Sequence, residues 1–156
     1  MKKNKILFVH DYFQDYGGGE RLILSLIQKS DLLITSFINY KIKNIIKKKF
    51  KILEINKKIK NRINKIFLPY YFYSLKNKIY YDNAFVSGNY SIFFDTKNLK
   101  NKIYYCHSLP KIFFEYNNFY KRNLIFKIFI SLSGFVFKPF YFYNLKKFNK
   151  IIVNSK

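Results

Sequence analysis

The sequence predicts an α/β fold: a single Rossmann-like, doubly wound and mostly parallel sheet with helices on both of its faces. Short apolar runs bounded by polar residues, which are typical of buried strands, recur along the chain. Lysine-rich or amphipathic stretches with helical periodicity separate them, and strands that alternate with helices pair in parallel through right-handed crossovers. No repeat, no Ser/Gly linker and no change of composition divides the 156 residues, so we expect one domain over residues 1–156.

Six segments are predicted to be strands, and the first of them also resembles the start of a signal peptide. Its apolar run extends only from Ile6 to Val9, whereas the apolar region of a signal peptide needs roughly 7–15 residues. We therefore expect a strand there. The six predicted strands are residues 5–11, 32–37, 51–55, 83–89, 102–108 and 150–156.

Four segments are predicted to be helical. The first follows the glycines and carries its apolar residues on one face. The last contains the most apolar stretch, residues 124–142, but two lysines and a proline interrupt it, and a membrane-spanning helix needs about 20 largely apolar residues. We expect this segment to pack in a core or lie on a membrane. The predicted helices are residues 20–28, 41–49, 57–75 with a break at Pro69, and 113–145 with a break near Gly134 or Pro139.

The formal charge of +22 has three explanations that the sequence leaves open. Only Arg21, Arg62 and Arg122 are arginines among the 30 basic residues, although nucleic-acid sites favour the forked guanidinium. Asn, Ile, Phe and Tyr, which share A/T-rich codons with Lys, are also abundant, so we interpret the charge mainly as coding bias on a solvated surface. Contact with an anionic membrane is the second explanation and nucleic acid the third. The single cysteine suits a reducing cytosol, so we expect a cytoplasmic protein, either free or peripheral on the inner face of the plasma membrane.

Polar residues end several of the predicted strands. In open parallel sheets, ligands bind outside the carboxyl ends of the strands, so we expect these residues to line one rim. His10 and Asp11 there either orient a substrate or close the strand end through structural hydrogen bonds. The strand-end groups are His10-Asp11, Ser87-Gly88-Asn89, His107-Ser108 and Asn154-Ser155.

Three consecutive glycines, Gly17, Gly18 and Gly19, lie between the first strand and its helix. Their spacing matches neither the dinucleotide-binding motif nor the P-loop. Free backbone amides at a helix start favour an anion by about 0.3–1 kcal/mol, and glycine lets a diphosphate approach the backbone. A flexible turn is the alternative. Glu20 and Arg21 open the helix, and Arg21 either supports an anion or is simply solvated.

His107 is the candidate catalytic residue, because a histidine on the ligand rim can bind a sugar hydroxyl or a phosphate. A structural role is the alternative. Lys111 is a candidate phosphate ligand or one surface lysine among many, and Cys106 is predicted to be a buried hydrophobe. Neither a catalytic triad nor a metal site can be assembled from two histidines, one cysteine and eight scattered acids.

Three motifs together resemble the family 4 glycosyltransferases, which have the two-domain GT-B fold. The stretch ILFVHDYFQDYGGGERLILSLIQ resembles their opening strand, His-Asp and Gly-Gly-x-Glu-Arg loop. YYCHSLPKIFFEY is similar to their YCHTP-type segment, and FNKIIVNSK to a later strand ending in Asn-Ser. The order and spacing agree from residue 5 to residue 156.

The resemblance implies retaining, metal-independent transfer of a sugar from a nucleotide-sugar to a glycan or lipid-linked acceptor, as in cell-envelope polysaccharide biosynthesis. No cofactor is implied. The glycine loop with Glu20 and Arg21 would lie against the donor diphosphate and the acceptor, and His107 would face the donor sugar. Lys111 stands where the family has arginine, Leu109 where it often has proline, and Phe114 where it has tryptophan.

The resemblance covers only the acceptor-side half of a GT-B fold. We expect the chain to end before the donor-binding domain and to be inactive or nearly so alone, as a gene fragment or as one subunit of a split enzyme with a separate donor-domain polypeptide. The alternatives are a non-catalytic basic domain that binds anionic membrane or nucleic acid, and a decayed gene remnant.

Overall fold

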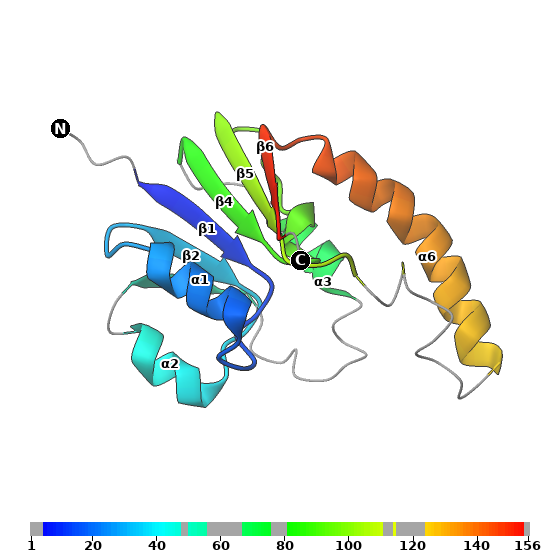
Figure 1. Ribbon diagram of the computed structural model, residues 1–156, viewed down its shortest axis with the longest axis horizontal. Helices are drawn as coiled ribbons and strands as arrows, with labels where there is room; N and C mark the ends of the chain where they lie inside the picture. Colours follow the sequence, from blue (N-terminus) through cyan, green and yellow to red (C-terminus); the bar gives the residue numbers. More distant parts are fainter. Residues whose placement is uncertain are drawn as a thin grey trace.

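All six predicted strands form one parallel sheet. The computed structural model describes residues 5–47, 50–55, 67–75, 81–110, 114 and 124–154. The strand order is β3-β2-β1-β4-β5-β6, and each neighbouring pair is parallel (Figure 1). This confirms the Rossmann-like α/β fold. The strands are β1 (Ile6–His10), β2 (Leu32–Thr35), β3 (Lys51–Glu54), β4 (Asn83–Ser87), β5 (Asn101–Cys106) and β6 (Lys150–Val153).

The strand order creates a crevice at the carboxyl end of β1. The chain moves from β1 outward through β2 to β3, then returns to place β4 on the other side of β1. The connections that leave β1 and β4 therefore run to opposite sides, and the crevice between them is where open α/β sheets bind ligands.

Alternation along β1 separates two apolar layers. Phe8 faces a layer with α1 (Gly18–Leu26) and α2 (Tyr40–Lys47), whereas Leu7 and Val9 face a layer with α3 (Leu68–Ser74), the 3-10 helix η2 (Ser91–Phe93) and the carboxyl end of α6 (Leu124–Leu145). Figure 1 shows α1 and α2 on one face of the sheet and α3 and α6 on the other. Because successive side chains of a strand point to opposite faces, each layer receives every second residue.

The predicted break in the last helix is wrong. α6 runs without interruption through Gly134 and Pro139. Pro139 lies on the exposed side of the helix, where water can reach the carbonyl that proline leaves without its helical donor. One turn spacing apart, Phe137, Tyr141 and Leu145 pack against the core and hold the helix in place. Within the described residues, no helix combines the length and apolarity needed to cross a membrane.

The predicted helix over residues 57–75, with its break at Pro69, is described only from Phe67 onward, where α3 begins at Leu68 and Pro69 lies in its first turn. The first turn does not use the N–H group that proline lacks, and the fixed φ of proline suits it. Residues 57–66 of the predicted helix, like residues 113 and 115–123 of the next one, lie outside the described residues.

Phe72→Ala should lower the free energy of unfolding by about 3–5 kcal/mol, because the ring is fully buried and its loss leaves a cavity. The neighbouring Tyr73→Ala is the control, since Tyr73 is 64% exposed and its removal should change stability by less than about 0.5 kcal/mol. Urea unfolding followed by circular dichroism measures both. Equal losses would contradict the layer assignment.

Candidate functional site

The imidazole of His107 lies directly against the backbone of Gly19. A Cβ atom placed on Gly19 would stand only 2.8 Å from both Cε1 and Nε2 of His107. His107 follows the end of β5 and is half-buried, while Gly19 lies in the first turn of α1. The structure thus brings the three glycines Gly17–Gly19, the glycine corner, together with the histidine at the rim. Only a residue without a side chain permits this approach.

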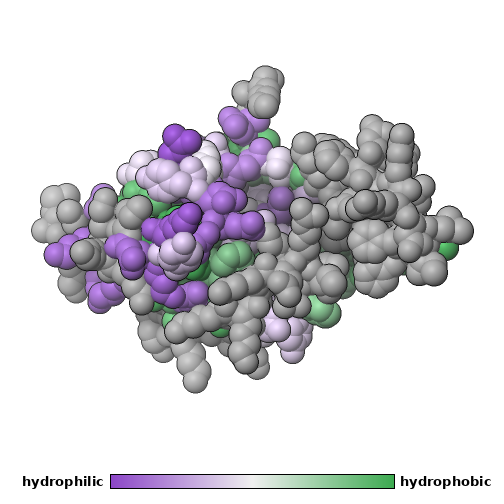
Figure 2. Space-filling view, turned by 90° about the horizontal axis from the view of Figure 1, so that it is seen from below, coloured by the Kyte–Doolittle hydropathy of each residue, from purple (hydrophilic) through white to green (hydrophobic). Residues whose placement is uncertain are grey.

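The rim is the lower edge of the sheet in Figure 1, where the strands end. Figure 2 views the molecule from below and therefore faces this edge. In the coloured part of that face, hydrophilic residues predominate and smaller hydrophobic patches show between them. A polar ligand is compatible with such a surface.

Ser87, the last residue of β4, holds both histidines. Its hydroxyl lies 2.9 Å from Nε2 of His107. Its carbonyl accepts a hydrogen bond from Nδ1 of His10, also at 2.9 Å. Since a carbonyl can only accept, the proton of the uncharged His10 ring is on Nδ1. Tyr105 adds an edge contact to His107, with ring centroids 4.5 Å apart, so the imidazole at the rim has a fixed position.

The two histidines are held in their uncharged forms. Burial lowers the pKa of His10 to about 4, with a smaller contribution from the nearby His107 and an opposing one from the hydrogen bond to Ser87. Burial also lowers the pKa of His107. At neutral pH, His107 can therefore both donate and accept hydrogen bonds.

Asp11 closes the turn that follows β4. Its buried carboxylate accepts the backbone N–H groups of Asn89, Tyr90 and Ser91 at 2.6, 2.9 and 2.7 Å. A Cβ atom on Gly88, whose φ is +119°, would collide with that carboxylate. Burial raises the pKa of Asp11 to about 6, although these hydrogen bonds oppose the shift. The bonds of His10 and Asp11 are therefore those of strand-end closure, the second of the two roles that the sequence left open.

A pair of tyrosines supports the same turn from within the core. The hydroxyl of Tyr104 donates to the carbonyl of Gly88 at 2.8 Å and lies 2.9 Å from that of Tyr141. Because the single proton of Tyr104 is used on Gly88, Tyr141 must donate to Tyr104. Sequence reasoning did not find this role of Tyr104, since only the packing of α6 on β5 reveals it.

Glu20 folds back over the start of α1. The helix has Gly17 as its N-cap, and the position of a Cβ on Gly17 is 2.7 Å from Oε2 of Glu20. Backbone N–H groups of Gly17 and Glu20 hydrogen-bond this carboxylate, while partial burial raises its pKa. This is one half of a capping box. An anion that bound Gly17 would have to compete with it.

Gly18 and Arg21 are the open part of the glycine corner. Apart from the adjoining residues and the backbone of its own helix, no atom lies within 4 Å of a Cβ placed on Gly18. Arg21 is exposed, and its guanidinium carbon lies 5.8 Å from the ring centroid of Tyr16. Lys111 lies outside the described residues. Cys106 is buried, as its expected role as a hydrophobe requires.

Over the residues that the structure describes, no group of three His, Cys, Asp or Glu side chains is arranged to hold a metal ion. Comparisons with family models, curated proteins and solved structures found no match to the chain.

Gly19→Ala should displace the His107 ring and change its NMR chemical shifts, because the new methyl group would overlap Cε1 and Nε2. Gly18→Ala is the matched control, one residue away in the same turn. It should leave the ring signals unchanged and raise stability by roughly 0.4–1 kcal/mol, since alanine restricts the unfolded chain. If both variants leave the His107 signals unchanged, the contact is absent.

His10→Asn should change how stability depends on pH. The contribution of the buried, uncharged His10 is fully present above about pH 6.5 and is lost as the pH falls toward 4. Asp11 acts oppositely, because its raised pKa stabilises the fold at low pH and this stabilisation is lost as the pH rises through about 6. An Asn amide can still donate to the carbonyl of Ser87, so the variant keeps the turn. The pH dependence of stability that Asp11 causes is then no longer offset by that of His10.

As the pH rises from 4 to 6, the free energy of unfolding of the His10→Asn variant should fall, relative to that of the unmodified chain, by roughly 1 kcal/mol per pH unit. Urea unfolding at several pH values measures the difference. Parallel pH profiles would mean that His10 is not buried uncharged.

Proposed function

We propose that this domain is the acceptor-side half of a retaining, metal-independent glycosyltransferase that transfers a sugar from a nucleotide-sugar to a glycan or lipid-linked acceptor. One observation supports it above the others: an uncharged, half-buried imidazole packs on the glycine corner at the crevice beside β1. Open α/β sheets bind their ligands in such a crevice. The three motifs of the sequence, in their order, point to the same family.

Each residue of the rim has a role in this proposal. The open backbone at Gly18 and the start of α1 provide positive potential for the donor diphosphate, and Arg21 adds a charge beside it. Nε2 of His107 engages Ser87, which leaves Nδ1 as the ring nitrogen that can meet a hydroxyl of the donor sugar. Glu20, beside the same corner, can accept a hydrogen bond from the acceptor.

The proposal also requires a second unit. The rim offers a place for a diphosphate and a sugar, and the family that the sequence resembles binds the base and ribose on a second Rossmann-like domain. We propose that turnover depends on such a domain, in the same or a separate polypeptide. Without such a domain, the 156-residue chain would bind a donor weakly and transfer little or no sugar.

Titration of the labelled chain with UDP and with GDP tests the role of the rim. Backbone amide signals of Gly18 and Gly19 and the ring signals of His107 should shift together, with a dissociation constant in the millimolar range (~4 kcal/mol). Arg21→Ala should weaken binding by about threefold to tenfold, whereas Arg21→Lys, which keeps the charge, should weaken it less. Shifts spread over surface lysines without any at the glycine corner would contradict the proposal.

A second candidate function, contact with an anionic membrane, is favoured by the exposed side of α6. The exposed apolar side chains of this helix recur at helical spacing. They include those of Leu132, Phe135, Val136, Phe140 and Tyr143. Their spacing puts them along one side, and the described lysines of this region, such as Lys138 and Lys146, carry a charge complementary to acidic headgroups. The proposal is that α6 lies in the interface of a lipid surface.

Flotation with vesicles tests this contact. The chain should bind phosphatidylserine-containing vesicles and should not bind pure phosphatidylcholine. Phe135→Ser, at a side chain that is 81% exposed, should reduce binding by roughly tenfold, because it removes one inserted aromatic ring. Tyr73→Ser on α3 is the matched control. Equal binding of both variants would show that α6 does not insert.

A further inference from the structure

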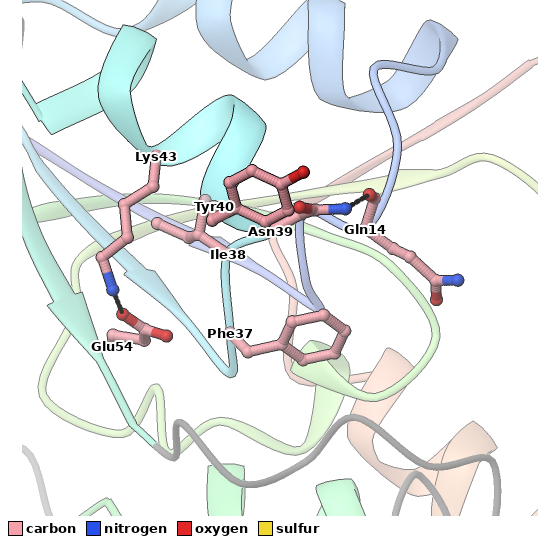
Figure 3. A pocket seen from close by; sticks show the side chains of 7 residues that line it. All are labelled: Gln14, Phe37, Ile38, Asn39, Tyr40, Lys43 and Glu54. Atoms are coloured by element: carbon pink, nitrogen blue, oxygen red, sulfur yellow. Dashed lines mark hydrogen bonds and ion pairs between the residues drawn. The ribbon is translucent and has the colours of Figure 1, made fainter.

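A pocket of about 420 Å³ opens at the carboxyl ends of β2 and β3. It lies between the chain that leaves β1, the loop from β2 to α2, and the end of β3 (Figure 3). Sites for small molecules in proteins have volumes of about 300–1,000 Å³. The sequence motifs did not point to this pocket, and none of the rim residues assigned above lines it.

Hydrogen bonds that extend the β1–β2 pairing fix one wall of the pocket. The N–H of Phe13 donates to the carbonyl of Phe37 at 3.0 Å, and the N–H of Asn39 donates back to that of Phe13 at 2.8 Å. The side-chain amide of Asn39 donates to the carbonyl of Gln14 at 3.0 Å (Figure 3). The wall is therefore preformed, which lowers the entropy that a ligand loses on binding.

An ion pair closes one end of the pocket. Nζ of Lys43 lies 2.6 Å from Oε2 of Glu54, and both side chains are mostly shielded from solvent. The two charges cancel, so the lining is uncharged overall although the whole chain carries +22. A phosphate or a nucleotide would have to separate Lys43 from Glu54, which argues for an uncharged ligand.

Aromatic rings occupy the other end. Figure 3 shows the rings of Tyr40 and Phe37 to one side of the ion pair, with Asn39 near them. Phe37 is nearly buried and stacks on Tyr12, whereas the ring of Tyr40 is 72% exposed. Such an exposed ring is available to a ligand, and it can be changed without disturbing the core.

Aromatic rings with an amide near them at one end, and a charged pair at the other, match the two surfaces of a sugar. The C–H face of a sugar ring packs on an aromatic ring. Its hydroxyls can donate to the oxygen of Glu54 that Lys43 does not engage, and charged partners give the stronger hydrogen bonds.

We propose that this pocket is a subsite for one uncharged sugar unit of an oligosaccharide acceptor. The inference rests on the proposed transferase function and narrows its acceptor class. β2 lies three strand positions from β5, which corresponds to roughly 14 Å across the sheet. The sugar in the pocket is therefore not the one that reacts beside His107. An acceptor that fills both places has more than one sugar unit.

Titration of the labelled full chain with maltotriose, cellotriose and triacetylchitotriose, read by NMR, tests the subsite without requiring turnover. At least one trisaccharide should shift the side-chain amide signals of Asn39 and Gln14. Tyr40→Ala should raise its dissociation constant about tenfold, since the ring provides the packing surface. Tyr73→Ala, which removes from α3 a tyrosine that is also largely exposed, should leave binding unchanged.

His107→Ala separates this inference from the proposed function. Trisaccharide binding at Asn39 that survives His107→Ala supports the subsite, even if UDP and GDP never shift the glycine corner and the transferase proposal fails. Conversely, nucleotide shifts at Gly18 with no trisaccharide shift at Asn39 up to 50 mM (roughly 2 kcal/mol of binding) would keep the proposed function and overturn the subsite. Tighter binding of inorganic pyrophosphate than of every trisaccharide in the pocket would also overturn it.

Discussion

The turn that follows β4 is the constraint on which the candidate site depends. The carboxylate of Asp11 accepts three consecutive N–H groups there, and Gly88 supplies the left-handed conformation that the turn needs. Ser87 opens the turn and bonds His10 with its carbonyl and His107 with its hydroxyl. One carboxylate thus organises the segment that holds the rim histidine, although it lies too deep to meet a ligand itself.

The electrostatics of this arrangement follow from burial. Asp11 and His10 are adjacent and both are buried, yet their pKa values move in opposite directions, since burial disfavours the charged form of each. At neutral pH His10 is therefore uncharged, whereas Asp11, with a pKa of about 6, is mostly ionised and three backbone N–H groups stabilise its charge. The charge at the rim comes from the helix start and from Arg21, which remain in contact with solvent.

The sequence predicts the sheet well and the site only in outline. The six strands could be found because each is a short apolar run with polar ends, and their common rim followed from parallel pairing. Pro139 misled the helix prediction, because a proline breaks a helix only where its missing N–H is needed and the packing is too weak to compensate. Pro139 stands on the solvent side of an anchored helix, whereas Pro69 stands in the first turn of one.

Contacts between distant segments were beyond the reach of sequence patterns. The sequence predicted that the glycines before α1 and His107 border one cleft, but not that the imidazole itself packs on Gly19. The role of Asp11 stayed ambiguous, because an acid at a strand end serves a ligand or a turn equally well until its partners are known. The pocket near Glu54 was not predicted, since its residues come from three separate segments and only Gln14 among them lies in a motif of the sequence.

The candidate site depends most directly on the contact between Gly19 and the His107 ring. Nuclear Overhauser effects measured in the free protein between Hε1 of His107 and the two α-protons of Gly19 report that contact without ligand or mutation. A strong cross-peak, as expected for atoms in van der Waals contact, is the predicted result. If His107 Hε1 instead shows cross-peaks only to core side chains, the glycine corner and the imidazole do not share a site.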